Sequence, residues 1–243
     1  MPQLTVNLDL LARLRAMGQF PEPDPAQAAV LAELAGADGI SIPFRQKQSY
    51  VKYRDLYLLR GVVKTKLILE IPPADDVVKA ALEIKPWMVT LVADHTDIAG
   101  PFSPIDFDTV ALDWNDIVLR FTGENINVCC FIDPEVNQVK AAAKAKASAV
   151  LINSSGYGRA DTVENARMEL DRIDRTVQAA VKTNLGVYCG RGLNYKNLAP
   201  LIELGYIDEF VIGQTLCTRA MLVGFERAVR DMIELTRIDR RQV

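Results

Sequence analysis

Residues 127–154, NVCCFIDPEVNQVKAAAKAKASAVLINS, contain the pattern that decides the fold. Two short apolar runs, 127–132 and 149–154, flank a longer stretch, 135–147, in which apolar residues recur at helical spacing. Two parallel strands of one sheet need such a crossover, and an α-helix usually supplies it. Asp133 and Pro134 offer a capping carboxylate and a proline suited to the first helical position. The stretch therefore predicts one strand–helix–strand unit of a parallel sheet.

The same unit recurs along the whole chain of 243 residues. Apolar runs that predict strands lie at Leu4–Leu8, Gly39–Phe44, Lys66–Ile71, Trp87–Ala93, Asn127–Ile132, Ala149–Ser154, Gly186–Gly190 and Asp208–Gly213. Helices are predicted near 25–35, 51–63, 74–85, 109–122, 135–147, 162–183, 195–204 and 215–236. This alternation without a break in composition favours an α/β fold, a (β/α)8 TIM barrel in one domain over residues 1–243. The alternative is a doubly wound open sheet.

Composition narrows the functional classes. The formal net charge is −3, so no strongly basic field attracts nucleic acid or anionic membranes. No apolar run approaches the about 18 residues of a membrane-spanning helix, and residues 1–10 lack the pattern of a secretory signal. The four cysteines include no CxxC pair, which disfavours zinc and suits a reducing compartment. We expect a cytoplasmic protein with no metal, no cofactor and no nucleic-acid or membrane partner.

Active residues of such barrels lie where the strands end and enter the following loops. Glu70 lies there in an apolar run, where a carboxylate is costly unless paired or protonated, so it is the leading acid–base candidate. The structural alternative is a salt bridge to Arg45 or another strand-end arginine, and both interpretations can hold. Arg45 and Arg191 can each bind a phosphate or carboxylate. Gly192 and Gly213 follow the seventh and eighth strands, where barrels often bind phosphate through backbone N–H groups.

Two further side chains are weaker candidates. Cys189 shares a strand face with Arg191 by alternation, which would place a thiol beside a guanidinium that lowers its pKa. A buried, inert thiol is the favoured alternative. His95, the only histidine of the sequence, lies in the loop after the fourth strand, and a lone loop histidine is usually solvated.

The strand ends carry motifs that resemble the pyridoxine 5′-phosphate synthase family. The matching stretches are Val6–Asp9 with Leu14-Arg15, Pro23–Pro25 with Gln27–Ala29, Ala35–Ile40, Arg54-Asp55, Leu69-Glu70, Lys85-Pro86, Phe131–Asp133, Gly190–Tyr195 and Ile212-Gly213. They occur in the order and spacing of the family over nearly the whole chain. The resemblance implies a TIM barrel that condenses 1-deoxy-D-xylulose 5-phosphate with 3-amino-2-oxopropyl phosphate in vitamin B6 biosynthesis. It also implies a homo-oligomer, an octamer.

The resemblance implies roles for individual residues as well. Asn7 matches an asparagine that contacts the phosphate of the amino ketone, and Asp9 matches an aspartate near the sugar phosphate. Arg45 matches a ligand of the sugar phosphate, and Glu70 matches the catalytic glutamate. The glycines after the seventh and eighth strands match glycines that line the second phosphate site.

The departures from the family pattern fall mainly on its histidines. The positions where the family has histidine hold Leu10, Pro43, Tyr50, Arg191 and Gln214, while Gly18 and Gly100 align near a family arginine and a family threonine. Proline cannot transfer a proton, and arginine stays protonated at any working pH. We retain Glu70 and Arg191 as catalytic candidates, and Tyr50 and Gln214 in the substrate-binding set.

Three functions therefore stay open. The first is an enzyme of this family, with Glu70 as base and a phosphorylated small carbonyl compound as substrate. The second is a non-catalytic module that binds a phosphorylated metabolite at the same strand ends. The third is a structural subunit of an oligomer. The loss of proton-transfer groups predicts that the parent condensation is altered or lost.

Overall fold

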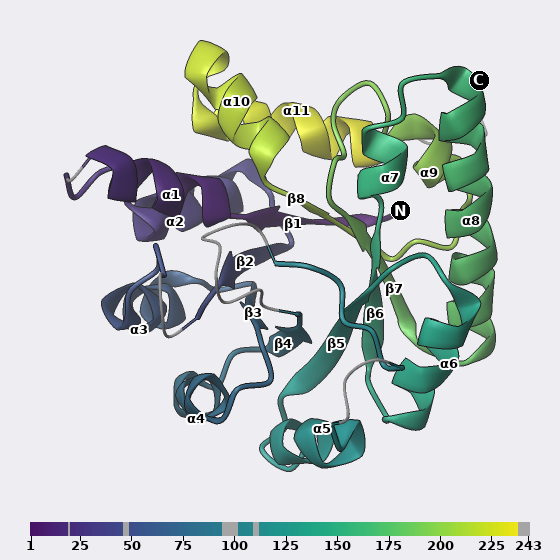
Figure 1. The fold of residues 1–243 in the computed structure, drawn as a ribbon. Coiled ribbons are helices and arrows are strands. Elements are labelled where there is room, and N and C mark those ends of the chain that lie inside the picture. The colour runs from purple at the N-terminus through teal and green to yellow at the C-terminus, as the bar shows by residue number, and fades with distance from the viewer. Residues whose placement is uncertain (19, 46–48, 94–101, 109–111, 238–243) are drawn as a thin grey trace.

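A computed structural model describes residues 1–18, 20–45, 49–93, 102–108 and 112–237. Within these residues, eight strands form one closed parallel barrel in chain order, and β1 pairs with β8 to complete the ring (Figure 1). The strands are β1 (Gln3–Asn7), β2 (Gly39–Pro43), β3 (Lys66–Ile71), β4 (Met88–Leu91), β5 (Asn127–Ile132), β6 (Ala149–Asn153), β7 (Gly186–Gly190) and β8 (Glu209–Ile212). The predicted TIM barrel is confirmed, and the open sheet is excluded.

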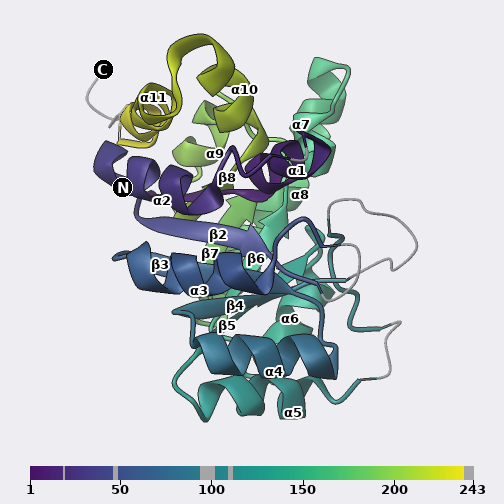
Figure 2. The same cartoon turned by 90° about the vertical axis from the view of Figure 1, so that its left-hand side faces the viewer.

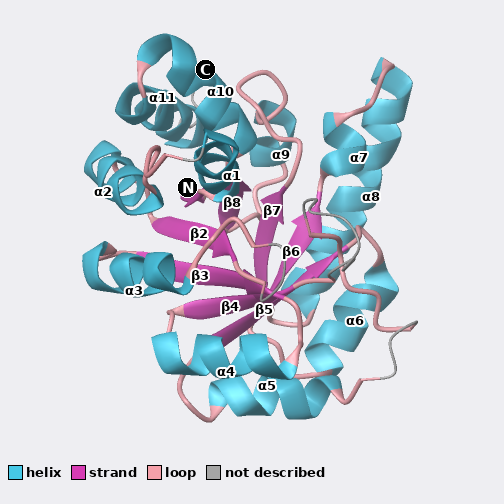
Figure 3. Ribbon diagram, turned by 60° about the vertical axis from the view of Figure 1, so that its left-hand side comes forward, coloured by secondary structure: helices cyan, strands magenta, loops and turns pink. Residues whose placement is uncertain are grey.

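Helices surround the strands as an outer ring (Figure 3), and α2 to α5 follow one another along one side of the barrel (Figure 2). They are α1 (Asp9–Gly18), α2 (Pro25–Ala35), α3 (Tyr53–Val62), α4 (Asp75–Ile84), α5 (Trp114–Thr122), α6 (Val136–Lys144), α7 (Ser155–Gly158), α8 (Val163–Lys182), α9 (Ala199–Glu203), α10 (Gln214–Val223) and α11 (Phe225–Arg237). No helix in the described ranges is long and apolar enough to cross a membrane.

The helix ends show which local signals decide the structure. Asp24 caps α2, and Pro25 is the first helical residue, as proline before a helical run leads one to expect. The predicted cap at Asp133 is wrong: α6 begins three residues later, and the Asp133 carboxylate instead accepts a hydrogen bond from Asn153 of β6 at 2.8 Å. The predicted helix 215–236 is helical except at Gly224, whose φ of 86° divides it into α10 and α11.

Two helices, α1 and α7, were not predicted. Each begins within two residues of the end of a strand, so each lies at the carboxyl end of the barrel. Only Ala12 of α1 and Tyr157 of α7 are buried. α7 spans four residues, too few to show a helical periodicity. α1 spans ten residues, six of them apolar, so its sequence carried a helical signal that was overlooked.

Strand alternation separates two apolar layers of the barrel. Side chains that point toward the barrel axis form a small cluster, which includes Ile68, Met88, Cys129, Phe131, Leu151 and Tyr188. Side chains of the opposite parity pack against the helices in a larger cluster, which includes Leu69, Cys130 and Cys189. Along each strand, alternate residues therefore point into the barrel interior, and the residues between them point toward the helices.

A buried ion pair lies in the barrel interior near the amino-terminal ends of the strands. Glu209 of β8 is 1% exposed, and its carboxylate accepts hydrogen bonds from Thr5 of β1 and Lys66 of β3. The Lys66 ammonium also donates to Gln3 at 2.8 Å and lies 5.2 Å from the centre of the Trp87 ring. These contacts thus connect β1, β3 and β8, and β1 and β8 are the two strands whose pairing closes the ring.

A second salt bridge attaches α1 to α3. The Arg15 guanidinium binds both oxygens of Asp55, at 2.8 and 2.6 Å, and Asp55 also accepts the Lys52 backbone N–H at 2.8 Å. Burial alone would raise the pKa of the Asp55 carboxyl. The hydrogen bonds from Arg15 and Lys52 outweigh burial and hold this pKa below its usual value.

We expect Lys66→Met to lower the free energy of unfolding by about 3–5 kcal/mol, because it leaves the Glu209 carboxylate buried without its cation. The double variant Lys66→Met/Glu209→Leu should recover most of this loss, since no charge is then buried. Urea denaturation followed by circular dichroism measures both changes. A loss below about 1 kcal/mol in the single variant, typical of a surface pair, would show that the barrel does not depend on this contact.

The Asp55 carboxyl predicts a pH dependence of stability. A carboxyl whose pKa is lower in the folded than in the unfolded state stabilises the fold above its unfolded pKa, and this contribution is lost as the pH falls through its folded pKa. We expect the difference in unfolding free energy between wild type and Asp55→Asn to be constant above about pH 6 and to shrink below about pH 4. Denaturation series at several pH values measure it, and a difference that is independent of pH would contradict the assignment.

Candidate functional site

Glu70 of β3 lies at the centre of a polar cluster in the barrel interior, at the carboxyl ends of the strands. Its side chain is 1% exposed. One carboxylate oxygen accepts from the Asn7 side-chain amide of β1 at 2.8 Å and from the Ser41 hydroxyl of β2 at 3.5 Å. The other oxygen accepts from the Arg191 guanidinium, after β7, at 2.8 Å. The structural alternative for Glu70 is thus confirmed: its partner is a strand-end arginine, namely Arg191.

Arg191 reaches Glu70 because its backbone is left-handed. Its φ is 79°, which is unusual for a residue with a side chain. The Ser154 hydroxyl holds the turn through the carbonyls of Gly190 and Arg191, at 2.8 and 2.7 Å. The guanidinium lies 5.0 Å from the centre of the Phe131 ring, and its Nε is buried with no hydrogen-bond partner among the described residues.

Cys189 does not share the side of Arg191, so this prediction from alternation is wrong. Cys189 belongs to the outer apolar layer against the helices and is fully buried. The left-handed turn at Arg191 breaks the alternation between the two residues. Burial raises the pKa of the Cys189 thiol to about 12, although hydrogen bonding to Ser154 and Gly190 opposes this shift. The thiol is therefore an inert part of the core, the favoured alternative.

The structure connects Asp9 and Tyr50 through a residue that the sequence did not single out. Asp9 is the first residue of α1, and its N–H donates to the Asn7 side chain at 3.0 Å. Its carboxylate binds the Arg13 guanidinium at 2.8 Å, and Arg13 lies 5.4 Å from the centre of the Tyr50 ring. Arg45 follows β2, and its guanidinium lies over the Phe102 ring at 4.1 Å.

Two different constraints favour glycine at the two positions of the predicted phosphate site. Gly192 has φ of 72°, which favours glycine. A Cβ atom on Gly213 would come within 2.6 Å of the Asn7 carbonyl oxygen, so only glycine fits between β8 and β1. Gln214 is exposed at the start of α10. Whether these residues bind phosphate stays a prediction, and His95 and Gly100 lie outside the described residues.

Ser41, Arg13 and the pair Asn153–Asp133 are polar residues of this end that sequence reasoning missed. Ser41 is two residues before Pro43, so strand alternation could have placed it in the interior beside Glu70. No comparable signal marks Arg13, because its helix was not predicted.

The cluster can fix a carboxylate and bind an anion, but it holds few groups that can move a proton. Each Glu70 oxygen already accepts at least one hydrogen bond, and its charged partner is a guanidinium, which only donates. Pro43, the last residue of β2, is beside Glu70 in the strand register and has no proton to transfer. Among the described residues, no group of three or more histidine, cysteine, aspartate or glutamate side chains could hold a metal ion.

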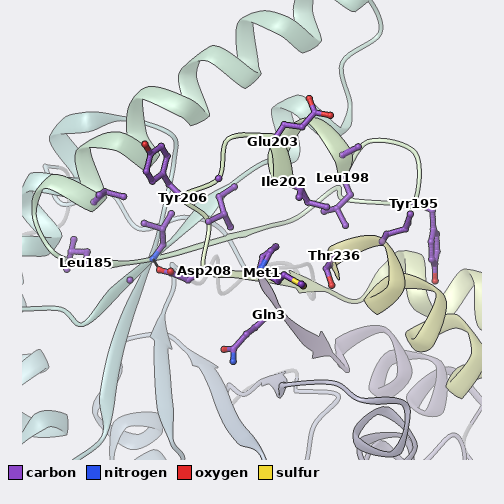
Figure 4. Close-up of a pocket in the computed structure, with 18 of the residues that line it drawn as sticks. Met1, Gln3, Leu185, Tyr195, Leu198, Ile202, Glu203, Tyr206, Asp208 and Thr236 are labelled. Carbon is purple, nitrogen blue, oxygen red and sulfur yellow. Dashed lines mark hydrogen bonds between the residues drawn. The ribbon is translucent and has the colours of Figure 1, made fainter. Parts of the chain in front are cut away.

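A separate cavity of about 1200 Å³ lies on the other side of the molecule (Figure 4). It opens between α8, α9 and α11, beside the amino-terminal ends of β7 and β8, and its lining includes Leu185, Ile202, Tyr206 and Asp208. The Asp208 carboxylate accepts the Val187 N–H at 2.8 Å, which is a structural contact between β7 and the residue before β8. The Glu70 cluster brings a buried carboxylate and a guanidinium together, so we place the candidate site there and not at this cavity.

Comparison with solved structures supports the fold. A structure described as native KDPGal has a TM-score of 0.60 at 15% identity, covering 98% of this chain and 95% of that chain. Monomers of dimeric phosphoribosylanthranilate isomerase from Thermotoga maritima give a TM-score of 0.58 at 12% identity, covering 97% and 98%. At such identities the likeness concerns the fold alone.

Sequence comparison identifies the family. The family model described as pyridoxal phosphate biosynthesis protein PdxJ matches residues 4–238. A pyridoxine 5′-phosphate synthase of Geobacter sulfurreducens is 39% identical over 237 residues, which cover 98% of this chain and 99% of the relative. That of Pelobacter propionicus is 40% identical over 235 residues, which cover 97% and 98%. The chain therefore belongs to the PdxJ family of pyridoxal phosphate biosynthesis proteins.

Proposed function

We propose that this protein binds phosphorylated small carbonyl compounds at the carboxyl end of its barrel, in a pyridoxine 5′-phosphate synthase-like role in vitamin B6 biosynthesis. We further propose that the parent condensation of 1-deoxy-D-xylulose 5-phosphate with 3-amino-2-oxopropyl phosphate is altered or lost. Family membership supports the first part, since the relatives are named pyridoxine 5′-phosphate synthase. The second part depends on the geometry at Glu70.

The Arg191–Glu70 ion pair is the observation that carries the proposal. A general base must take a proton from the substrate, and both oxygens of the Glu70 carboxylate already accept hydrogen bonds, one of them from a guanidinium. The position that resembles a family histidine therefore holds a group that fixes charge and cannot donate a proton at neutral pH. Arginine is at the same time well suited to phosphate, which it can bind through two parallel N–H donors.

The second candidate function is a non-catalytic paralogue that binds a phosphorylated metabolite. The same ion pair favours it, because it neutralises the acid–base candidate while a guanidinium stays at the mouth. Our proposal also includes a homo-oligomer in the cytoplasm without nucleic-acid or membrane partners. The family resemblance supports the oligomer, and the net charge of −3 supports the exclusion of polyanions.

The parent reaction tests the catalytic part. We expect purified wild type, given both parent substrates, to form pyridoxine 5′-phosphate at least about 10²-fold more slowly than the double variant Pro43→His/Arg191→His. One positioned acid–base group contributes about 10²–10⁴-fold to a rate. Product formation is followed by chromatography, with Glu70→Gln as the inactive control. Rapid wild-type turnover that Glu70→Gln abolishes would show that other proton donors sustain the old reaction.

Ligand affinity tests the binding part. We expect Glu70→Gln to bind 1-deoxy-D-xylulose 5-phosphate at least as tightly as wild type, because Arg191 is released from its ion pair. Adding Arg191→Ala to Glu70→Gln should then weaken binding by about 1.5–3 kcal/mol, the value of hydrogen bonds to a charged group. Both variants avoid a buried carboxylate without a partner. Isothermal titration calorimetry measures the affinities, and equal affinities in the two variants would remove Arg191 from the ligand site.

A further inference from the structure

Two arginines of α1, Arg13 and Arg15, make different contacts although they are two residues apart. The Arg15 guanidinium makes three hydrogen bonds, two to Asp55 and one to the Tyr50 carbonyl at 3.0 Å. Arg13 forms a salt bridge to Asp9, one helical turn earlier, at 2.8 Å. Its guanidinium also faces the Tyr50 ring at 5.4 Å. Arg15 thus links α1 to α3, whereas Arg13 lies on the side of α1 that carries Asp9.

Arg13 is incompletely satisfied among the described residues. A guanidinium has five N–H donors. The Arg13 Nε is buried and has no hydrogen-bond partner in the described part of the chain, although its side chain is only 21% exposed. Buried donors without an acceptor are rare in folded proteins and call for an explanation, such as an ion that completes the site.

Hydrogen bonds connect Arg13 to the centre of the candidate site. Arg13 binds the Asp9 carboxylate, the Asp9 N–H donates to the Asn7 side chain, and the Asn7 amide donates to Glu70. The helix that carries Arg13 begins directly after β1, at the carboxyl end of the barrel. A group bound at Arg13 would therefore belong to the same ligand site as Glu70.

The charge of Asp9 gives the second reason. The Asp9 carboxylate is itself an anion, and an anionic ligand in direct contact with it would be repelled. A cation between the two removes this conflict. Arg13 is the cation that the structure places on the Asp9 carboxylate, and the Tyr50 ring restricts the guanidinium on a second side.

We propose that Arg13 is an additional anion-binding residue of this site, which receives the phosphate group of a phosphorylated carbonyl compound. Asp9 and Tyr50 are positioning residues that orient its guanidinium. A phosphate monoester suits this arrangement because a guanidinium binds it through parallel N–H donors. This inference rests on the proposed function and names one phosphate-binding group of that same site.

Binding of 1-deoxy-D-xylulose 5-phosphate and of inorganic phosphate tests this assignment, by isothermal titration calorimetry on the full chain. We expect Arg13→Ala to weaken binding of the phosphate ester about 10- to 100-fold, as for loss of hydrogen bonds from a charged group. Arg13→Lys should keep part of the affinity, because it keeps the charge but not the planar donor pair. Arg230→Gln, which removes an exposed arginine paired with Glu226 on α11, is the matched control and should bind as wild type does.

A structural explanation predicts a different result. If Arg13→Ala acted only by leaving Asp9 without a partner, the double variant Arg13→Ala/Asp9→Asn would regain wild-type affinity, and that outcome would overturn the proposal. We expect the double variant to melt close to wild type and still bind weakly. Unchanged affinity in Arg13→Ala would overturn the Arg13 assignment while the proposed function stands. Wild type that binds neither probe would overturn both.

Discussion

The ion pair between Glu70 and Arg191 is the interaction on which the arrangement of the barrel mouth depends. A carboxylate that is 1% exposed needs a compensating charge, because an unpaired charge in the interior costs several kcal/mol. β3 and β7 are four strands apart in a ring of eight, so Arg191 reaches Glu70 from across the barrel. It does so only with a left-handed backbone, which Ser154 holds through two carbonyls. The ion pair thus joins β3 to the turn after β7, which Ser154 in turn joins to the end of β6.

The barrel interior holds a buried ion pair toward each end and apolar side chains between them. Glu209 and Lys66 lie near the amino-terminal ends of the strands, and Glu70 and Arg191 near the carboxyl ends. The two pairs differ in what surrounds them. Glu209 accepts hydrogen bonds from Thr5 of β1 and from Lys66, the first residue of β3, whereas Arg191 directly follows β7 in a turn that Ser154 holds. The Glu209–Lys66 pair therefore joins strand residues, and the Glu70–Arg191 pair joins a strand to a loop.

The fold could be predicted from the sequence because strand and helix periodicities are local properties. Runs such as Asn127–Ile132 and the cap at Asp24 need no information from distant residues. The site was only partly predictable. Strand alternation places Glu70 in the interior, but the same rule fails for Cys189 and Arg191, because a positive φ reverses the direction of one side chain. Arg13 was missed because α1 was not recognised as a helix, although six of its ten residues are apolar.

Arg191, at a position where the family resemblance implies a histidine, handles charge and protons differently from an imidazole. A neutral imidazole can give and take protons and leaves a nearby carboxylate free to act as base. A guanidinium does neither: Arg191 binds the Glu70 carboxylate. Under the proposed function, a phosphate at the mouth would compete with Glu70 for the same N–H donors. Under the proposed function, an anion that draws Arg191 away would leave Glu70 with only the neutral donors Asn7 and Ser41.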